Sequence, residues 1–245
     1  MISVILNVYK RQYTLEHQIQ AVLNQSISTK PEDIHIWYNY SGIGQELPKN
    51  KEIKVYKCNW NTKFFGRFTI PLLCQTPYIA MFDDDILPGK DWLKNCLDTI
   101  ENPETNGILG GSGIILIRKL YDPHIKVGWN GIKSDKAERV DLTGHGWFFR
   151  QEWTKFLFYD KIINWDNGED IAFSYLAQKY GNINTFVPPH PINKINMWSS
   201  DPIFGGNVGS DSNASYIINE NHNSERNELC KYYIENGWKT VNNIQ

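Results

Sequence analysis

The sequence contains few cysteines and no long apolar segment. Its four cysteines, Cys58, Cys74, Cys96 and Cys230, are far apart and form no Cys-x-x-Cys pair. This spacing argues against a structural zinc site and is typical of separate thiols in a reducing compartment. No apolar run reaches the roughly 20 residues of a membrane-spanning helix, and the N-terminus has no signal-peptide pattern. We therefore expect a cytoplasmic protein without a membrane span.

An excess of charge of either sign is also missing. Lys and Arg number 25 against 27 Asp and Glu, which gives a net charge of −2. No basic stretch follows the repeat of a polyanion, so nucleic acid is not an expected partner. The chain has 245 residues, of which 41% are hydrophobic, and this supports a sizeable core. We expect a single domain over residues 1–245.

The first hundred residues alternate between strand and helix patterns. The expected strands are Ser3–Val8, Asp33–Tyr38, Ile53–Tyr56 and Tyr78–Phe82. The expected helices are 15–25, Phe64–Cys74 and Trp92–Ile100. This alternation predicts an α/β fold, with a mostly parallel sheet covered by helices on both faces. In such folds, ligands bind beyond the carboxyl ends of the strands.

The remaining residues are less regular. The expected strands are Ile114–Leu120, Val140–Phe149 and Thr185–Val187, and the expected helices are Trp153–Phe158, Glu169–Tyr180 and Ser224–Asn236. The stretch Ser199–Ser215 is rich in Gly, Asn, Ser and Asp, a composition typical of loops. We expect it to be a mobile loop that closes as a lid when a ligand binds.

Three consecutive aspartates, Asp83, Asp84 and Asp85, follow the apolar strand Tyr78–Phe82. Adjacent carboxylates repel one another, so they require a solvated turn or a hard cation. An exposed turn is the simpler explanation, but the preceding strand places the cluster at the ligand edge of the sheet. Mg²⁺ or Mn²⁺ there would take one or two carboxylates and complete its shell with phosphate oxygens. Alternation along an extended segment puts Asp83 and Asp85 on one side and Asp84 on the other. We expect Asp85 and Asp83 to serve the metal, with Asp83 and Asp84 also contacting the donor.

A second acidic pair, Glu169 and Asp170, opens an expected helix. The helix dipole favours carboxylates there, and this explanation requires no function. In the functional interpretation, both are candidate catalytic residues. Asp170 would lie beside the reacting sugar carbon, as a general base for the acceptor hydroxyl or as support for oxocarbenium-like charge.

A third group is Gly144-His145-Gly146-Trp147. Two glycines around a histidine allow the backbone to approach a ligand closely. The simpler explanation is a tight turn with a core tryptophan. In the functional interpretation, Gly144, His145 and Trp147 contact the acceptor or the sugar, and Trp147 stacks on the sugar ring. His145 alone is no metal site.

The order of these motifs resembles that of the GT-A glycosyltransferases. Asp83-Asp84-Asp85 precedes Val140-Asp141-x-x-Thr143-Gly144, and Glu169-Asp170 follows. The likeness is closest to the exostosin-like domain of glycosyltransferase family 64, and family 2 is the other possibility. Three further segments resemble the exostosin-like pattern: Trp37-Tyr38-Asn39, Phe64-Phe65-Gly66-Arg67-Phe68 and His222 to Cys230. The resemblance implies a GT-A fold, a Rossmann-like central mixed sheet flanked by helices.

The resemblance also implies roles for individual residues. Asn39 and Arg67 would hold the uridine and its diphosphate, and Arg226 would contact the diphosphate. Asp83 would contact the ribose or the donor sugar, Asp85 the metal, and Asp170 would lie at the reaction centre. The segment that wraps the uracil corresponds to Asn7 to Arg11, and its candidate donor contacts are Asn7, Tyr9 and Arg11. Residues 1 to about 100 would form the nucleotide-binding half, and about 101 to 245 the acceptor-binding half.

Two features depart from the exostosin-like pattern. That family has a small apolar pair after Thr-Gly, where this chain has His145-Gly146-Trp147. Its members also lie behind a membrane anchor in the secretory pathway. A cytosolic bacterial or viral relative therefore fits this chain better. The expected reaction transfers a hexosyl or N-acetylhexosaminyl group from a UDP-sugar to a hydroxyl of a saccharide or glycan, with Mn²⁺ or Mg²⁺.

Two other functions fit parts of the same pattern. A catalytically inactive glycan-binding protein would use the tryptophans and the aspartates for glycan and Ca²⁺. A sugar nucleotidyltransferase would usually carry a glycine-rich loop after the first strand. The segment Asn7–Thr14 contains no glycine, and this counts against the second alternative.

Overall fold

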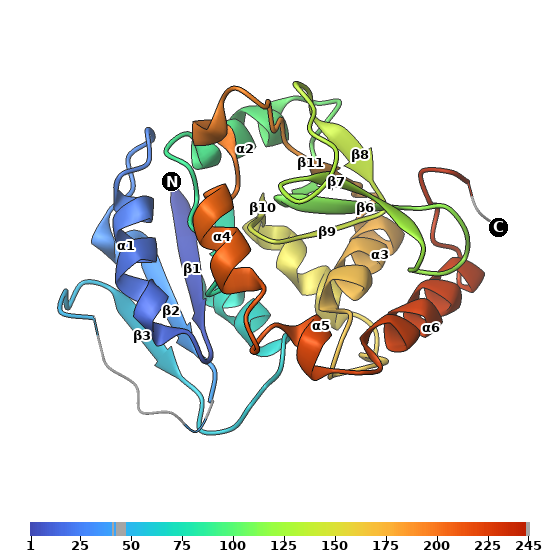
Figure 1. Ribbon diagram of the computed structural model, residues 1–245, viewed down its shortest axis with the longest axis horizontal. Helices are drawn as coiled ribbons and strands as arrows, with labels where there is room; N and C mark the ends of the chain where they lie inside the picture. Colours follow the sequence, from blue (N-terminus) through green and yellow to red (C-terminus); the bar gives the residue numbers. More distant parts are fainter. Residues whose placement is uncertain (41, 43–47, 244–245) are drawn as a thin grey trace.

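The computed structural model describes residues 1–40, 42 and 48–243. Within them, eight strands form a mixed sheet in the order β3-β2-β1-β4-β10-β5-β11-β8 (Figure 1). Their bounds are β1 Ile2–Val8, β2 Ile34–Tyr38, β3 Lys54–Lys57, β4 Tyr78–Phe82, β5 Ile108–Leu109, β8 Glu138–Val140, β10 Trp147–Arg150 and β11 Thr185–Val187.

The first four strands of this sheet are parallel, as the sequence predicts. Leu6 of β1 lies opposite Ile36 of β2 on one side and Phe82 of β4 on the other. Strand β10 then runs antiparallel to β4, with Trp147 opposite Met81. The beginning of β10 therefore lies beside the carboxyl end of β4, which is the end that carries the aspartates.

A smaller antiparallel sheet has the order β7-β6-β9. Its strands are β6 Ser112–Leu116, β7 His124–Gly128 and β9 Leu142–Gly144. The predicted strand Val140–Phe149 is thus wrong as one element. The chain leaves the small sheet after Gly144 and enters the large sheet at Trp147, because the two halves of the segment pair with different partners.

The helices cover both sheets. Their bounds are α1 Leu15–Leu23, α2 Trp92–Glu101, α3 Glu169–Gly181, α4 Pro202–Gly209, α5 Ser215–Ile218 and α6 His222–Glu235. Short 3₁₀ helices occur at η1 Gln12–Thr14, η2 Pro31–Asp33, η3 Gly66–Leu73, η4 Gln151–Phe158 and η5 Ile195–Met197. Figure 1 shows α4 between the β1–α1 unit and the strands β9 and β10.

The expected loop Ser199–Ser215 contains helix α4, so this prediction is wrong in part. Asp201 accepts hydrogen bonds from the backbone of Ile203 and Phe204 and thereby caps the helix. Pro202 occupies the first turn, where its missing N–H costs nothing. Local capping therefore outweighs the low helix propensity of the glycines and the asparagine in α4.

An aromatic cluster fills the centre of the core. The ring of Phe68 packs edge-on against Trp147 and Phe173, with centroid distances of 5.6 and 5.5 Å. These three residues come from η3, β10 and α3, so the cluster fastens the two halves of the chain together.

No helix in the described part of the chain has the length and the apolar character that a bilayer span requires.

Candidate active site

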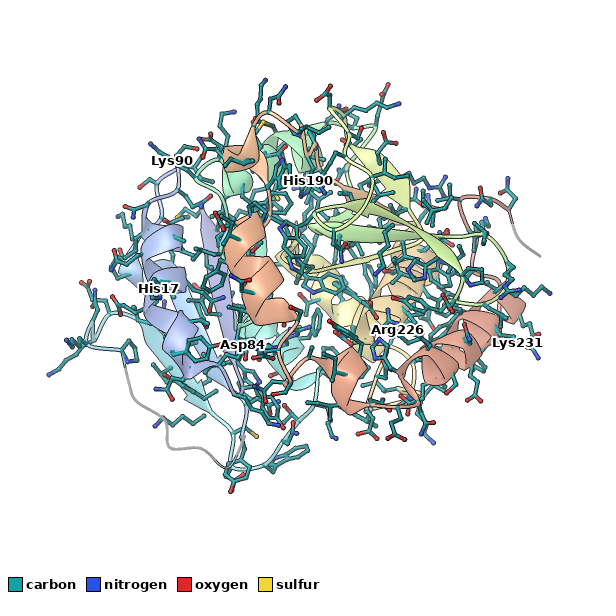
Figure 2. The ribbon with its side chains drawn as sticks, viewed as in Figure 1. His17, Asp84, Lys90, His190, Arg226 and Lys231 are labelled. Carbon is teal, nitrogen blue, oxygen red and sulfur yellow. The ribbon has the colours of Figure 1, made fainter. Side chains whose placement is uncertain are left out.

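A cleft of about 900 Å³ lies beyond the carboxyl end of β4. Its volume is within the range of small-molecule and cofactor sites. All of the predicted site residues line it: Asn7, Tyr9, Arg11, Asn39, Arg67, Asp83, Asp84, Asp85, Gly144, His145, Trp147, Glu169, Asp170 and Arg226. Residues as far apart in the sequence as Asn7 and Arg226 thus meet in one site. In Figure 2, Asp84 and Arg226 lie on either side of the segment that joins α4 to α5.

The three aspartates form a turn that the β1–α1 region holds in place. The N–H of Ile86 donates to the carbonyl of Asp83 at 3.2 Å. The side-chain amide of Gln18 donates to the carbonyls of Asp83 and Ile86 at 2.6 and 2.8 Å. Thr14 Oγ1 donates to the carbonyl of Asp84 at 2.8 Å. The backbone is therefore fixed, and the three carboxylates have set directions.

Asp84 points into the protein rather than toward a ligand. It is 6% exposed, and its Oδ1 accepts a 2.7 Å hydrogen bond from Arg11. Its Oδ2 accepts longer bonds of 3.4 Å from the N–H groups of Tyr9 and Arg11. Burial raises the pKa of Asp84, and the Arg11 charge opposes this rise. This arrangement differs from the expected donor contact, because Asp84 is already satisfied within the fold.

Arg11 is likewise committed to carboxylates. Besides Asp84, it binds both oxygens of Asp211 at 2.7 and 3.0 Å and lies 3.6 Å from Asp85. Burial alone would lower the pKa of Arg11, but its bonds to Asp211 and Asp84 outweigh burial and raise it. The guanidinium is thus a fixed internal cation next to the aspartate turn.

Arg67 connects the two acidic motifs. Its guanidinium pairs with Asp83 and donates to Glu169 at 3.0 Å, although these carboxylates lie 86 residues apart in sequence. Burial, followed by the charge of Asp170, raises the pKa of Glu169. Arg67 is 3% exposed and is placed by η3 beneath the cleft. It therefore holds the aspartate turn and the start of α3 in register.

Asp170 is in the first turn of α3, two residues after the left-handed Gly168. A Cβ at Gly168 would lie 2.2 Å from Leu229, and its φ is +83°, so glycine is required there. The two Asp170 oxygens accept from the Ile171 N–H at 2.9 Å and from Arg226 at 2.5 Å. This carboxylate is therefore held in one orientation.

Arg226 is clamped on several sides. Its guanidinium lies 4.2 Å from the centroid of the Tyr121 ring and donates to Asn167 Oδ1 at 3.2 Å. Burial alone would lower its pKa, but the Asp170 charge outweighs burial and raises it. Arg226 lines the cleft, and its charged partner is Asp170.

The nucleotide-side residues lie around one loop. The amide of Asn39 binds Thr62 at 2.9 Å and the Lys63 carbonyl at 3.1 Å. Asn61 donates to the Tyr9 hydroxyl at 3.1 Å. Asn39 is 4% exposed, so it fixes loop 61–63 at the rim of the cleft as well as lining it. Asn7 lines the same end of the cleft.

Trp147 differs from its expected role. Its ring is 1% exposed and lies in the aromatic cluster, so it offers no open face for stacking on a sugar. Gly144 lies beside the candidate catalytic carboxylate, since a Cβ added there would be 4.0 Å from Asp170 Oδ2. His145 has a left-handed backbone, with φ +55°, and stacks on Trp129.

Several functional candidates do not emerge from the sequence motifs. Asp211, Tyr121 and Trp129 contact Arg11, Arg226 and His145 respectively. Their segments carry no recognisable pattern, and only their long-range contacts reveal them. The Asp201-Pro202 pair that starts α4 is a local signal that does indicate a helix.

No group of three or more His, Cys, Asp or Glu side chains suited to a metal ion occurs in the described part of the chain. A metal held by one or two carboxylates, together with a ligand's phosphates, does not need such a group. Asp85 is the aspartate best suited to this arrangement. Its nearest cation, Arg11, lies at 3.6 Å, too long for a hydrogen bond, and its side chain is 22% exposed.

Comparison with solved structures supports the fold. GalNAc-T7, solved with UDP, GalNAc and Mn²⁺, has a TM-score of 0.57 and 14% identity, covering 77% of this chain and 42% of that one. The mannosyltransferase PcManGT from Pyrobaculum calidifontis, solved with GDP-Man and Mn²⁺, has a TM-score of 0.49 and 13% identity, covering 79% of this chain and 58% of that one. This chain thus spans less than two thirds of either protein. The first likeness confirms the predicted GT-A fold.

Comparison of sequences gives the family. None of the curated proteins matches the chain significantly. The sequence model of glycosyl transferase family 2 matches residues 3–158, more than half of the chain. The match includes the aspartate turn and the His145 segment. It selects the second of the two families that the motifs resemble, and the closer likeness to the exostosin-like domain stays a prediction. The chain belongs to glycosyl transferase family 2.

Proposed function

We propose that this chain transfers a sugar from a UDP-sugar to a hydroxyl of a saccharide or glycan, with Mn²⁺ or Mg²⁺ bound at Asp85 and Asp83. The observation that carries the proposal is the meeting of the aspartate turn and Asp170 in one cleft, with arginines between them. Membership of family 2 supports the reaction class.

The charges around Asp85 fit a divalent cation. Burial raises the pKa of Asp85, and the charge of Arg11 at 3.6 Å opposes this rise only in part. An added cation would stabilise the ionised carboxylate. Gly209 faces Asp85, and a Cβ there would lie 3.4 Å from its Oδ2, so the glycine keeps this side of the carboxylate open. When bound, the metal would neutralise charge on the diphosphate leaving group.

The chain's own groups bind and orient the reactants. Arg67 keeps Asp83 at the edge of the cleft, where this carboxylate can accept a hydrogen bond from a ribose or sugar hydroxyl. Arg226 and the Ile171 N–H hold Asp170 toward the reacting carbon. As a general base, Asp170 would accept the proton of the acceptor hydroxyl. The acceptor's oxygen would then bond to the anomeric carbon as the bond between that carbon and the diphosphate breaks. As an electrostatic support, it would stabilise positive charge on the sugar ring. The anomeric configuration of the product distinguishes these roles.

The test measures binding first and transfer second. Thermal shifts with UDP- and GDP-hexoses, and with UDP- and GDP-N-acetylhexosamines, each with and without Mn²⁺, identify the nucleotide and the sugar class. We expect metal-dependent stabilisation by one UDP-sugar family. Transfer to a saccharide panel is then followed by mass spectrometry.

The outcomes separate the alternative functions. Tight binding of free glycan without any nucleotide would replace the proposal with an inactive glycan-binding protein. Release of pyrophosphate from UTP and a sugar phosphate would replace it with a nucleotidyltransferase. Binding of GDP-sugars alone would correct the donor and leave the reaction class.

A further inference from the structure

The turn between β9 and β10 contains a histidine where a glycine would be easier to accommodate. His145 has φ +55° and lies between Gly144 and Gly146. A left-handed backbone is unfavourable for residues with a Cβ, and glycine adopts it freely. Folding of this turn therefore does not explain the histidine.

The His145 ring is held in one orientation by Trp129. The two rings stack with centroids 4.5 Å apart and an interplanar angle of 16°. Trp129 is fixed in turn, because its Nε1 donates to the Ser200 carbonyl at 2.9 Å. It also packs closely on α4, where a Cβ added to Gly205 would approach the Trp129 ring within 2.6 Å. The orientation of His145 is thus set by groups from the small sheet and from α4.

No other residue in the described part of the chain is a hydrogen-bond partner of this ring. Nδ1 is buried without a hydrogen bond to another residue, and the one hydrogen bond that affects the ring's pKa is to the backbone of His145 itself. The residue is half-buried and lines the cleft. Burial lowers its pKa to about 4, so the ring is neutral at pH 7 and has one donor and one acceptor nitrogen. An oriented polar ring with unused hydrogen-bonding capacity suits a ligand hydroxyl.

The position of His145 identifies which part of a ligand it would meet. On one side, Gly144 abuts Asp170, at 4.0 Å from an added Cβ to Oδ2. On the other side, an added Cβ at Gly146 would lie 3.7 Å from the ring of Phe82, the residue before Asp83. In the proposed reaction, the transferred sugar lies between the diphosphate at the aspartates and Asp170. His145 lines the cleft between the aspartates and Asp170.

We propose that His145, oriented by Trp129, hydrogen bonds a hydroxyl of the transferred sugar and so determines which sugar the enzyme accepts. This inference rests on the proposed function. A neutral imidazole offers no counter-charge to a carboxylate, and the nearby cations Arg67 and Arg226 are already paired with Glu169 and Asp170. The transferred sugar is therefore an uncharged one rather than a uronic acid. Trp129 is a positioning residue.

The test uses substitutions that are compatible with the left-handed backbone at position 145. His145→Gly removes the ring and fits φ +55°, whereas His145→Asn retains a polar group in a residue that tolerates this conformation. Trp129→Leu removes the stacking partner, and His17→Asn on the exposed face of α1 is the matched control. The measurements are kcat/KM for UDP-glucose, UDP-galactose, UDP-N-acetylglucosamine and UDP-glucuronic acid, and the Kd of UDP with Mn²⁺.

We expect His145→Gly to lower kcat/KM for the preferred donor by 10- to 100-fold, roughly the value of one good hydrogen bond to a ligand. The ratio of kcat/KM for the preferred donor to kcat/KM for its epimer should fall by at least about tenfold. The Kd of UDP should change less than about twofold. His145→Asn should restore part of the ratio, and Trp129→Leu should lower it without changing the Kd of UDP. The control should match the unchanged protein.

Two kinds of result would overturn the inference. The first is discrimination by His145→Gly and His145→Asn equal to that of the unchanged protein, or a preference for UDP-glucuronic acid. The proposed reaction would survive that result. The second is an unchanged protein that neither binds nor uses any sugar nucleotide, which would remove both proposals. Circular dichroism and Tm confirm that each variant is folded.

Discussion

Arg11 binds Asp211 through two hydrogen bonds of 3.0 and 2.7 Å, although 200 positions separate the residues in the sequence. The same guanidinium donates to Asp84 in the aspartate turn at 2.7 Å. One cation therefore links the segment after the first strand, the candidate metal turn and the segment that follows α4. Helix α4, which precedes Asp211, lies beside Asp85, because a Cβ added to its Gly209 would be 3.4 Å from the Asp85 Oδ2.

The Arg11–Asp211 pair should control the opening of α4. We expect Asp211→Asn to speed hydrogen exchange of the amides in residues 203–210 by roughly fivefold, which corresponds to about 1 kcal/mol for a partly exposed, two-point ion pair. Global stability should change by less than this amount. Exchange measured by mass spectrometry, with and without UDP and Mn²⁺, checks both statements.

Asp160→Asn is the control for this variant. It breaks a different ion pair, with Lys179 at 2.7 Å, and it lies far from α4 in the sequence and outside the cleft lining. Unchanged exchange over 203–210 in Asp211→Asn would show that packing alone holds α4. Equal exchange with and without UDP and Mn²⁺ would count against a lid.

Substitution of Asp85 should weaken metal binding without lowering the stability of the fold. We expect Asp85→Asn to raise the Mn²⁺ concentration for half-maximal UDP binding by at least about 100-fold, since a carboxylate ligand is lost. Without metal, the variant should be as stable as the unchanged protein or more stable, because burial raises the pKa of Asp85 and its charge is under-compensated. Calorimetric titration of UDP at several Mn²⁺ concentrations and a thermal melt check the two effects.

The exposed Asp135→Asn is the matched charge change outside the cleft. Metal-dependent UDP binding that survives unchanged in Asp85→Asn would move the metal to another residue.

The sequence predicts the nucleotide side of the fold well because its signals are local. The strands over Ser3–Val8 and Tyr78–Phe82 are short apolar runs, and the structure places strands β1 and β4 there with boundaries that differ by at most one residue. The aspartates after Tyr78–Phe82 are likewise placed at the ligand edge by the strand itself. No long-range contact is needed for either inference.

The sequence does not show which strands pair with each other or which charged side chains form ion pairs. Val140–Phe149 has the pattern of one strand, but its halves pair with β6 and β4 in different sheets. The direction of Asp84 depends on Arg11, and the pairing of Asp83 depends on Arg67. The orientation of a buried carboxylate depends on the nearest cation, and only the tertiary structure shows which cation that is.

Asp170 should govern turnover more than binding. We expect Asp170→Asn to lower kcat by about 10² to 10⁴-fold, the usual effect of losing a base or a charge at the reaction centre. The Kd of UDP with Mn²⁺ should change by less than about threefold. Steady-state kinetics and calorimetry provide the two numbers.

The variant also leaves Arg226 without its charged partner at 2.5 Å. A fall in stability of about 1–3 kcal/mol is therefore expected, and assays belong well below the Tm. Glu228→Gln, an exposed change two residues from Arg226, is the control. Full activity of Asp170→Asn would remove this residue from the reaction centre.

His190 should make the fold sensitive to mild acid. The residue is 1% exposed. Its Nδ1 lies 2.8 Å from the Pro188 carbonyl, and its Nε2 lies 3.4 Å from the Ser199 N–H. Donation from Nδ1 and acceptance at Nε2 define a neutral ring, which a second proton would disrupt. Burial lowers its pKa from 6.5 to about 4.

The sign of the effect follows from proton uptake. Between pH 6.5 and about 4, the unfolded chain binds a proton on His190 that the folded chain does not, so stability falls as the pH falls through this range. Since one pKa unit corresponds to about 1.4 kcal/mol, the loss reaches about 3 kcal/mol. Buried carboxylates such as Asp84 and Glu169 act in the opposite direction, because their pKa values are raised. His190→Gln should therefore flatten the acid side of the stability curve, whereas His17→Gln should not. Urea unfolding at pH 7.5, 6.0 and 5.0 measures this difference, and parallel curves for His190→Gln and the unchanged protein would contradict it.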